Sequence, residues 1–191
     1  MNENDRTRAL LELVAVLDDI GAPYIVTGDL AFVHWGMDRA IESIEVGVGV
    51  AGGDRSNVAG RLLVRFDYRT GRSAELFEKH RILQLKDRRG VAADVRFLIL
   101  DYEKEAVRRG VAVEFGDAPV KFCTAEDLII FKLASPSEAD RNDARALFRS
   151  GKGELDLAHL EPIVLGVAGM MEYPDLWEFW REVKRAAGKP N

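Results

Sequence analysis

The sequence predicts an α/β (α+β) fold with a mixed, mostly antiparallel sheet of about four to six strands, flanked by helices and followed by a helical C-terminal part. Two observations predict this class. Over residues 1–122, short runs of β-branched and aromatic residues alternate with runs that place apolar residues at helical spacing. Residues 123–191 are dominated by helical spacing. We therefore expect an α/β core of residues 1–122 and a helical C-terminal extension of residues 123–191 packed on it.

The first helix and strand open this core. Arg6 to Ile20 carries apolar residues at helical spacing, and a Gly-Ala-Pro sequence ends the helix. Tyr24 to Val26 is a short β-branched and aromatic run, which predicts a strand. Gly28 supplies the bend after this strand, and Asp29 is expected to cap a short helix of residues 30–35.

The next strand has two unlike faces. Isoleucine and valines occupy the even positions from Ile44 to Val50, and Glu45 and two glycines occupy the odd positions. Because alternate side chains of a strand leave opposite faces, Glu45 should lie on the face opposite the valines.

The remaining elements follow from turn residues and periodicity. Further strands are predicted at 64–68, 81–86, 91–100, 112–114 and 120–122. Helices are predicted up to Leu63 from a cap at Asp54 or Ser56, and at 102–109, 142–149, 156–167 and 174–187, with another opened by Thr124. Residues 69–75 are predicted to be a polar loop.

Composition limits the classes of function. Of 191 residues, 47% are hydrophobic, which suffices for a buried core. The formal net charge of −5 disfavours a protein that clamps nucleic acid through a broad basic surface. Two basic runs remain candidates for a local patch, although such runs are more often only solvated: Arg65, Arg69 and Arg72, and Lys86, Arg88 and Arg89.

Cysteine content and hydropathy indicate the compartment. Cys123 is the sole cysteine, which excludes an internal disulfide and a multi-cysteine metal site. No apolar run approaches the roughly 20 residues that span a bilayer. The first residues, MNENDRTR, lack the apolar core of a signal peptide. We therefore expect a cytoplasmic protein that does not act at a membrane.

The stretch from Tyr24 to Val50 resembles the nucleotidyltransferase fold and, more narrowly, the family of AbiEii-type toxins and minimal nucleotidyltransferases. In that family a hydrophobic residue, Gly, and Gly or Ser precede a short helix, and an acidic-hydrophobic-acidic triplet begins the next strand. Here these positions are Thr27-Gly28-Asp29 and Ser43-Ile44-Glu45, separated by thirteen residues as in the family. Arg39-Ala40-Ile41 is similar to an Arg-Ala-Thr that often precedes the triplet. The chain departs from the pattern at Asp29, where the family has a small residue, and at Ser43, where it has an acid.

The resemblance continues to about residue 150 and implies a set of site residues. Asp94, in VAADVRFLIL, matches the third acidic residue of the family, on the strand beside the acidic pair. CTAEDLIIFKLA is similar to a recurring helix that contains Lys132, and Arg141-Asn142-Asp143 matches its Arg-x-Asp. The implied catalytic residues and metal ligands are Glu45 and Asp94, with Mg²⁺ or Mn²⁺ as the cofactor if the protein is active. The implied nucleotide-binding residues are Gly28, Asp29, Arg39, Ser43, Lys132 and Arg141.

The chemistry explains why this pattern matters. In nucleotidyl transfer an acceptor hydroxyl attacks the α-phosphorus of a triphosphate, and two divalent ions neutralise the developing charge. Carboxylates two residues apart on one strand, with a third from its neighbour, can hold those ions because alternate residues share a face. Ser43 shares the face of Glu45 but is a neutral ligand, which should lower metal affinity.

Two functions follow from the resemblance. The first is a degenerate nucleotidyltransferase-like protein that binds a nucleoside triphosphate or serves as a non-catalytic regulatory or binding protein. The second is an active, metal-dependent enzyme of a toxin–antitoxin pair that transfers a nucleoside monophosphate to a protein or RNA acceptor. A cognate antitoxin-like protein is the implied protein partner.

Simpler interpretations stand beside these. Asp29 is a good helix cap, Asp94 also suits the exposed face of a half-buried strand, and Lys132 can extend its amine from an apolar helix into solvent. Residues 47–52 fit G-x-G-x-x-G, with Asp67 near the distance of a ribose-binding acid, which makes a Rossmann-type dinucleotide-binding protein another alternative. However, these glycines alternate with valines inside a predicted strand instead of following one.

Overall fold

The computed structural model describes residues 2–50, 54–135, 137–150, 155–170, 172 and 174–187. By its internal contacts the chain divides into two compact units. One comprises Met1–Ala31 and Arg39–Cys123 and holds the strands, and we call it the sheet unit. The other comprises Phe32–Asp38 and Thr124–Asn191 and is helical, and we call it the helical unit. Helix α2, Gly28–His34, begins in the sheet unit and ends in the helical unit.

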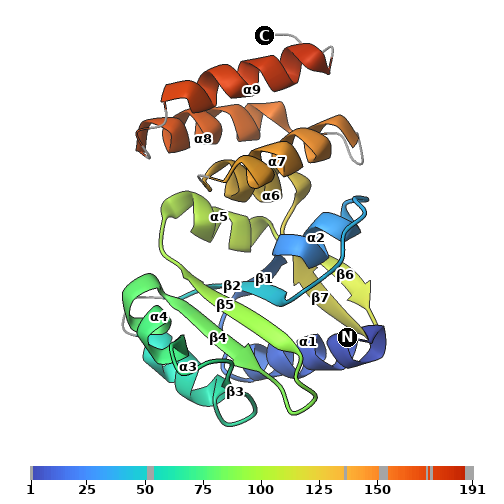
Figure 1. Ribbon diagram of the computed structural model, residues 1–191, viewed down its shortest axis with the longest axis vertical. Helices are drawn as coiled ribbons and strands as arrows, with labels where there is room; N and C mark the ends of the chain where they lie inside the picture. Colours follow the sequence, from blue (N-terminus) through green and yellow to red (C-terminus); the bar gives the residue numbers. More distant parts are fainter. Residues whose placement is uncertain are drawn as a thin grey trace. The chain divides into compact units, whose positions relative to one another are not determined.

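Within the described residues, seven strands form one sheet in the order β3-β4-β5-β2-β1-β7-β6 (Figure 1). Their bounds are β1 Tyr24–Thr27, β2 Ile44–Gly49, β3 Asp67–Tyr68, β4 Ile82–Lys86, β5 Ala92–Leu98, β6 Val111–Phe115 and β7 Ala118–Phe122. β2 runs parallel to β5 and β1 runs parallel to β7, and the other four pairs are antiparallel. The predicted mixed, mostly antiparallel sheet is therefore confirmed. The expected number of strands was too low, because the two-residue β3 and the β6–β7 hairpin both join this sheet.

The sheet unit also contains α1 Glu3–Asp19, α3 Arg55–Leu62, α4 Ser73–His80 and α5 Asp101–Arg109. Asn2 caps α1 by accepting a hydrogen bond from the amide of Asn4 at 2.7 Å. The apolar stripe of α1 is buried as its spacing predicts, and it consists of Ala9, Leu10, Leu13, Val14 and Leu17. The central strands are buried on the valine face of β2, where Val46 and Val48 are at most 1% exposed.

The helical unit contains α6 Ala125–Leu133, α7 Glu138–Ser150, α8 Leu157–Met170 and α9 Pro174–Ala186. Thr124 caps α6 as predicted, because its hydroxyl accepts a hydrogen bond from the amide of Asp127 at 3.1 Å. Trp180 of α9 is fully buried and meets the ring of Phe148 edge-on, with 4.9 Å between ring centroids. Of the helices in the described part of the chain, none has the length and apolar content needed to cross a bilayer.

Three local predictions were wrong. Ser73–His80 forms α4, although the sequence indicated a polar loop and the approach to a strand, because its buried side is only Ser73 and Phe77 and gives little periodic signal. Asp54 occupies the cap position of α3 but has helical backbone angles and makes no capping bond. Helix α2 begins at Gly28, so Asp29 lies inside the first turn and is not its cap.

Candidate functional site

Two carboxylates lie side by side on the sheet. β2 and β5 are parallel neighbours, and their register pairs Glu45 with Asp94. Since adjacent strands lie about 4.8 Å apart and paired residues share a face, the two side chains leave the same surface next to each other. The opposite face of β2 carries the buried Ile44, Val46 and Val48, as the alternation predicts. The structure thus brings the two predicted acidic residues together, and their catalytic role stays a prediction.

Gly28 lies directly against Glu45. The antiparallel register of β1 and β2 pairs Thr27 with Glu45, and Gly28 follows with φ +61°, in the left-handed region. A Cβ atom at Gly28 would lie 2.2 Å from the carboxyl carbon of Glu45 and 2.2 Å from its Oε1. Only glycine fits there without moving that carboxylate. The turn that would face a phosphate in the resembled family therefore has an acidic group packed against it.

Asp94 is held by an arginine that sequence reasoning did not assign to the site. The two guanidinium Nη atoms of Arg69 donate to the two Asp94 carboxylate oxygens, at 2.8 and 3.0 Å. The backbone of Arg69 is positioned by a hydrogen bond from its amide to the carbonyl of Gln84, which pairs with Asp94 in the register of β4 and β5. The side chains of Arg69 and Asp94 are 27% and 21% exposed.

The remaining predicted residues of the sheet unit lie around this pair. Arg39 Nη1 donates to Asp29 Oδ1 at 3.3 Å, and both side chains are partly exposed. Ser43 lies in a bend one residue before β2, so strand alternation does not fix its side chain on the face of Glu45. The family motif indicated Arg39 and Asp29 singly and did not predict their contact, and the Arg69–Asp94 pair had no local signal in the sequence.

These groups do not fit a divalent cation. Mg²⁺ and Mn²⁺ need several oxygen ligands, and family members supply three carboxylates. In the described ranges of this chain, no group of three or more His, Cys, Asp or Glu residues is placed to hold a metal ion. Both oxygens of Asp94 already accept hydrogen bonds from Arg69. A guanidinium therefore neutralises one of the two carboxylates that the resemblance assigns to the metal.

Lys132, another predicted nucleotide-binding residue, belongs to the helical unit. Its amine lies 2.7 Å from Asp140 Oδ1 and 3.0 Å from Asp143 Oδ2, and its side chain is 13% exposed. Burial alone would lower the pKa of Lys132, but the hydrogen bonds and charges of the two aspartates prevail and raise it. The expectation that Lys132 extends into solvent is wrong, because it is enclosed with two acidic partners.

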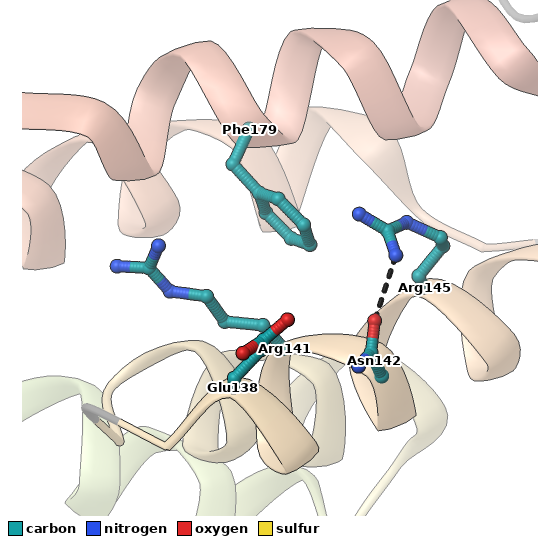
Figure 2. Close-up of a pocket in the computed structure, with 5 residues that line it drawn as sticks. All are labelled: Glu138, Arg141, Asn142, Arg145 and Phe179. Carbon is teal, nitrogen blue, oxygen red and sulfur yellow. Dashed lines mark hydrogen bonds between the residues drawn. The ribbon is translucent and has the colours of Figure 1, made fainter.

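Arg141 lines a cavity of about 370 Å³ in the helical unit, together with Glu138, Asn142, Arg145 and Phe179. Figure 2 shows Phe179 reaching from one helix toward the two arginines on the facing helix, and Arg145 bonded to Asn142 at 2.7 Å. Arg141 donates to Asp175 Oδ2 at 2.8 Å. Its Nε atom is buried and has no hydrogen-bond partner among the described residues.

The glycines of β2 do not form a dinucleotide-binding turn. Gly47 and Gly49 lie inside the strand, on the face of Glu45. A Cβ atom at Gly47 would lie 2.7 Å from Leu98, and one at Gly49 would lie 3.4 Å from Val107 of α5. These glycines therefore make room for packing against the sheet. The Rossmann interpretation is wrong at these two positions, and Gly52 lies outside the described residues.

No family model matches the sequence, and no curated protein matches it significantly. Solved structures do. The crystal structure of ANT(2")-Ia in complex with adenylyl-2"-tobramycin has a TM-score of 0.54 at 13% identity, covering 87% of this chain and 99% of that chain. The solution structure of the antibiotic-resistance factor ANT(2")-Ia has a TM-score of 0.54 at 14% identity, covering 95% and 100%. A nucleotidyltransferase-like antigen from Paracoccidioides brasiliensis has a TM-score of 0.43 at 14% identity, covering 93% of each chain. This protein therefore has the fold of a nucleotidyltransferase.

Proposed function

We propose that this protein is a degenerate nucleotidyltransferase that has lost metal-dependent transfer and acts as a binding or regulatory protein. One observation carries the proposal. The guanidinium of Arg69 donates hydrogen bonds to both carboxylate oxygens of Asp94, the residue that the resemblance assigns to the metal. The pair is bidentate and charge-assisted, which is the strong class of side-chain hydrogen bond. The guanidinium of Arg69 thus takes the position that a divalent metal ion would occupy.

A divalent ion must compete with the guanidinium of Arg69 for Asp94, and this competition weakens its binding. To coordinate a metal through both oxygens, Asp94 must release Arg69, and the arginine must then find another anion or return to solvent. Because both side chains are mostly shielded, salt screens this pair less than a surface pair. Glu45 alone offers a single carboxylate, and Ser43 offers no charge. We therefore expect weak binding of Mg²⁺ and Mn²⁺.

The phosphate side of the site supports the same conclusion. The carboxylate of Glu45 packs against Gly28, and Asp29 stands in the first turn of α2. Two acidic groups beside the turn repel a triphosphate unless a cation lies between them. Arg39, the basic residue bonded to Asp29, is already paired. We therefore expect nucleoside triphosphates to bind weakly, and we favour the regulatory or binding role over the nucleotide-binding one.

The finer assignment to the AbiEii-type family is part of the same proposal. Its support is the sequence pattern around Arg39-Ala40-Ile41 and Arg141-Asn142-Asp143. Membership would bring the toxin–antitoxin context, a cytoplasmic location and a cognate antitoxin-like protein as the partner. A toxin-like chain that no longer transfers nucleotides would retain the partner surface without the reaction.

The register of β2 and β5 favours one second candidate, an active enzyme. Glu45 and Asp94 remain side by side, as metal-dependent transfer requires. If Arg69 withdrew, the two carboxylates could face a divalent ion, with Ser43 or water completing the coordination. The structural relative ANT(2")-Ia was solved with adenylyl-2"-tobramycin, a nucleotidylated product. Here the acceptor would be a protein side chain or an RNA end.

A transfer assay separates the two. Purified protein is incubated with each of the four α-labelled nucleoside triphosphates in Mg²⁺ or Mn²⁺, alone, with RNA or with a tRNA mixture. We expect no labelling of the protein or the RNA above that of Glu45→Ala. Labelling by the wild type that disappears in both Glu45→Ala and Asp94→Asn would refute the degenerate assignment and establish the enzyme.

Direct metal binding tests the role of Arg69. We expect Arg69→Ala to bind Mn²⁺ about tenfold more tightly than the wild type, since about 1.4 kcal/mol corresponds to tenfold and a charged hydrogen-bonded pair contributes about that much. Free Mn²⁺ is followed by its electron paramagnetic resonance signal. Arg72→Ala is the matched control, because Arg72 belongs to the same run but its side chain is 81% exposed and forms an ion pair with Glu75 at 3.8 Å. Equal Mn²⁺ affinities of Arg69→Ala and wild type would show that the guanidinium does not occupy a metal position.

A further inference from the structure

A second cavity lies in the sheet unit, apart from the residues of the candidate site. It has a volume of about 280 Å³ and is lined by Glu12, Arg65, Arg88 and Arg89. Arg65 follows α3, the two consecutive arginines lie in the turn between β4 and β5, and Glu12 belongs to α1. Members of the two basic runs of the sequence, more than twenty residues apart, therefore meet at one hollow. Three arginines and one glutamate line this cavity, in a chain with a net charge of −5.

Arg89, one of the three arginines, is held in place by two carboxylates. The carboxylate of Asp87, a residue 4% exposed, accepts hydrogen bonds from the amides of Arg89 and Val91 at 2.9 and 2.8 Å and from Arg89 Nε at 2.7 Å. Arg89 Nη2 also lies 3.1 Å from Glu12 Oε1. Arg89 therefore lines the cavity with its guanidinium held between two carboxylates.

The other two arginines are not engaged. Both are exposed, and within the described residues neither Arg65 nor Arg88 has a side-chain hydrogen bond or an ion pair. The three arginines exceed Glu12 and Asp87 by one positive charge. Charged groups of one sign that converge without partners are a site for an ion of the other sign. Two guanidinium groups remain available to donate to an anion held against Arg89.

We propose that this cavity binds a small phosphate anion of the size of pyrophosphate. Guanidinium groups present planar pairs of N–H donors that match the oxygens of a phosphate. Three arginines line this space together with Glu12, which already contacts Arg89. The volume lies just below the range of about 300 to 1,000 Å³ that pockets for drug-sized ligands occupy, so a di- or monophosphate fits better than a whole nucleotide. A nucleic acid would require a row of basic contacts along its backbone, and the acidic balance of the chain disfavours that occupant. This site uses no residue of the proposed degenerate centre and needs no metal.

Calorimetry with the full chain tests the proposal, with inorganic pyrophosphate, inorganic phosphate and a twelve-nucleotide RNA titrated separately at constant ionic strength without divalent ions. We expect pyrophosphate to bind, phosphate to bind more weakly, and the RNA to bind more weakly than pyrophosphate. Arg65→Ala and Arg88→Ala should each weaken pyrophosphate binding about tenfold, because each removes a charged hydrogen-bond donor. Since both side chains are exposed, the melting temperature without ligand should not change.

Arg72→Ala is the matched control, an exposed arginine of the first basic run that does not line the cavity. Pyrophosphate binding by this variant should equal that of the wild type. No binding of pyrophosphate at millimolar concentration would overturn the proposal, as would an equal loss in Arg72→Ala, which would indicate a diffuse charge effect. Tighter binding of the RNA than of pyrophosphate, reduced by the same two substitutions, would instead identify a nucleic-acid patch. None of these outcomes depends on whether the protein transfers nucleotides.

Discussion

Two aspartate–arginine pairs of the sheet unit have similar distances but different surroundings. Asp94 lies on the face of β5, and among the described residues its carboxylate accepts hydrogen bonds from the guanidinium of Arg69 alone. Asp87 meets Arg89 in the turn that precedes β5, and its carboxylate also accepts two backbone amides. The side chain of Asp94 is 21% exposed, whereas that of Asp87 is 2% exposed. The turn pair is therefore part of the framework, and the strand pair occupies a surface on which chemistry could take place.

The largest effect is expected when the framework pair is broken. Asp87→Ala leaves the amides of Arg89 and Val91 and the guanidinium of Arg89 without their acceptor, and it should lower the free energy of unfolding by about 3 kcal/mol. Asp94→Ala should lower it by at most about 1 kcal/mol, because the pair is partly exposed and the substitution also removes the repulsion from Glu45. Urea unfolding followed by circular dichroism at neutral pH measures both.

Asp54→Ala is the matched control for these two substitutions. Asp54 is exposed and makes no capping bond despite its position before α3, so its removal should leave the unfolding free energy within about 0.5 kcal/mol of the wild type. An equal loss of unfolding free energy in Asp94→Ala and Asp87→Ala would show that the two pairs have the same structural role.

Alkaline pH separates the two aspartate–arginine pairs from other titratable groups, because guanidinium groups stay protonated there while a half-buried tyrosine loses its proton. Burial and the neighbouring Glu103 raise the pKa of Tyr102 from 10.0 to about 12. The folded state therefore retains this proton more firmly than the unfolded state, so the contribution to stability is complete below pH 10 and is lost as the pH rises from 10 to about 12. Tyr102→Phe should reduce that alkaline loss by about 1 to 2 kcal/mol.

The measurement is the free energy of unfolding of wild type and Tyr102→Phe at several pH values between 8 and 12. Lys132 changes stability in the same direction, since its pKa is also raised, so some alkaline loss should remain in the variant. Both Asp–Arg pairs should survive the titration, because guanidinium groups stay protonated. An identical pH profile for wild type and variant would show that the tyrosine does not contribute.

The parts of this fold that depend on local periodicity were predictable. Alternation along β2 placed Glu45 opposite the valines, and the cap at Thr124 followed from its residue type. The two-residue β3 pairs with β4 across a stretch that contains α4, and that nonlocal pairing decides where Arg69 lies. Helix α4 buries too few apolar residues to show a period. The sequence therefore predicted the scaffold better than the contacts that decide its chemistry.

The candidate site divides in the same way. The family motif indicated Glu45 and Asp94, and the register places them together. The neutralisation of Asp94 by Arg69 could not be predicted. Arg69 follows β3, and the pairing of β3 with β4 has no signal in the sequence near Asp94. The basic runs were recognisable as runs only, and their convergence on one cavity depends on how α3 and the β4–β5 turn are folded. Charge patterns along a chain locate groups that can act, and tertiary structure decides which of them meet.

The smallest effect is expected from restoring the acid that the family has at Ser43. Ser43→Asp adds a carboxylate in the bend before β2, but Asp94 remains bonded to Arg69, so Mn²⁺ affinity should rise by twofold at most, about 0.4 kcal/mol. Combined with Arg69→Ala, the same substitution should raise affinity well beyond that of Arg69→Ala alone, because the new acid, Glu45 and a released Asp94 then repel one another until a cation binds. Paramagnetic resonance titrations of the wild type, both single variants and the double variant measure this coupling. Independent effects of the two substitutions would mean that Ser43 and Arg69 do not act on a common cation position. A large gain in Mn²⁺ affinity from Ser43→Asp alone would mean that a metal readily displaces Arg69 from Asp94. Glu45 and Asp94 would then form an active site that lacks one metal ligand.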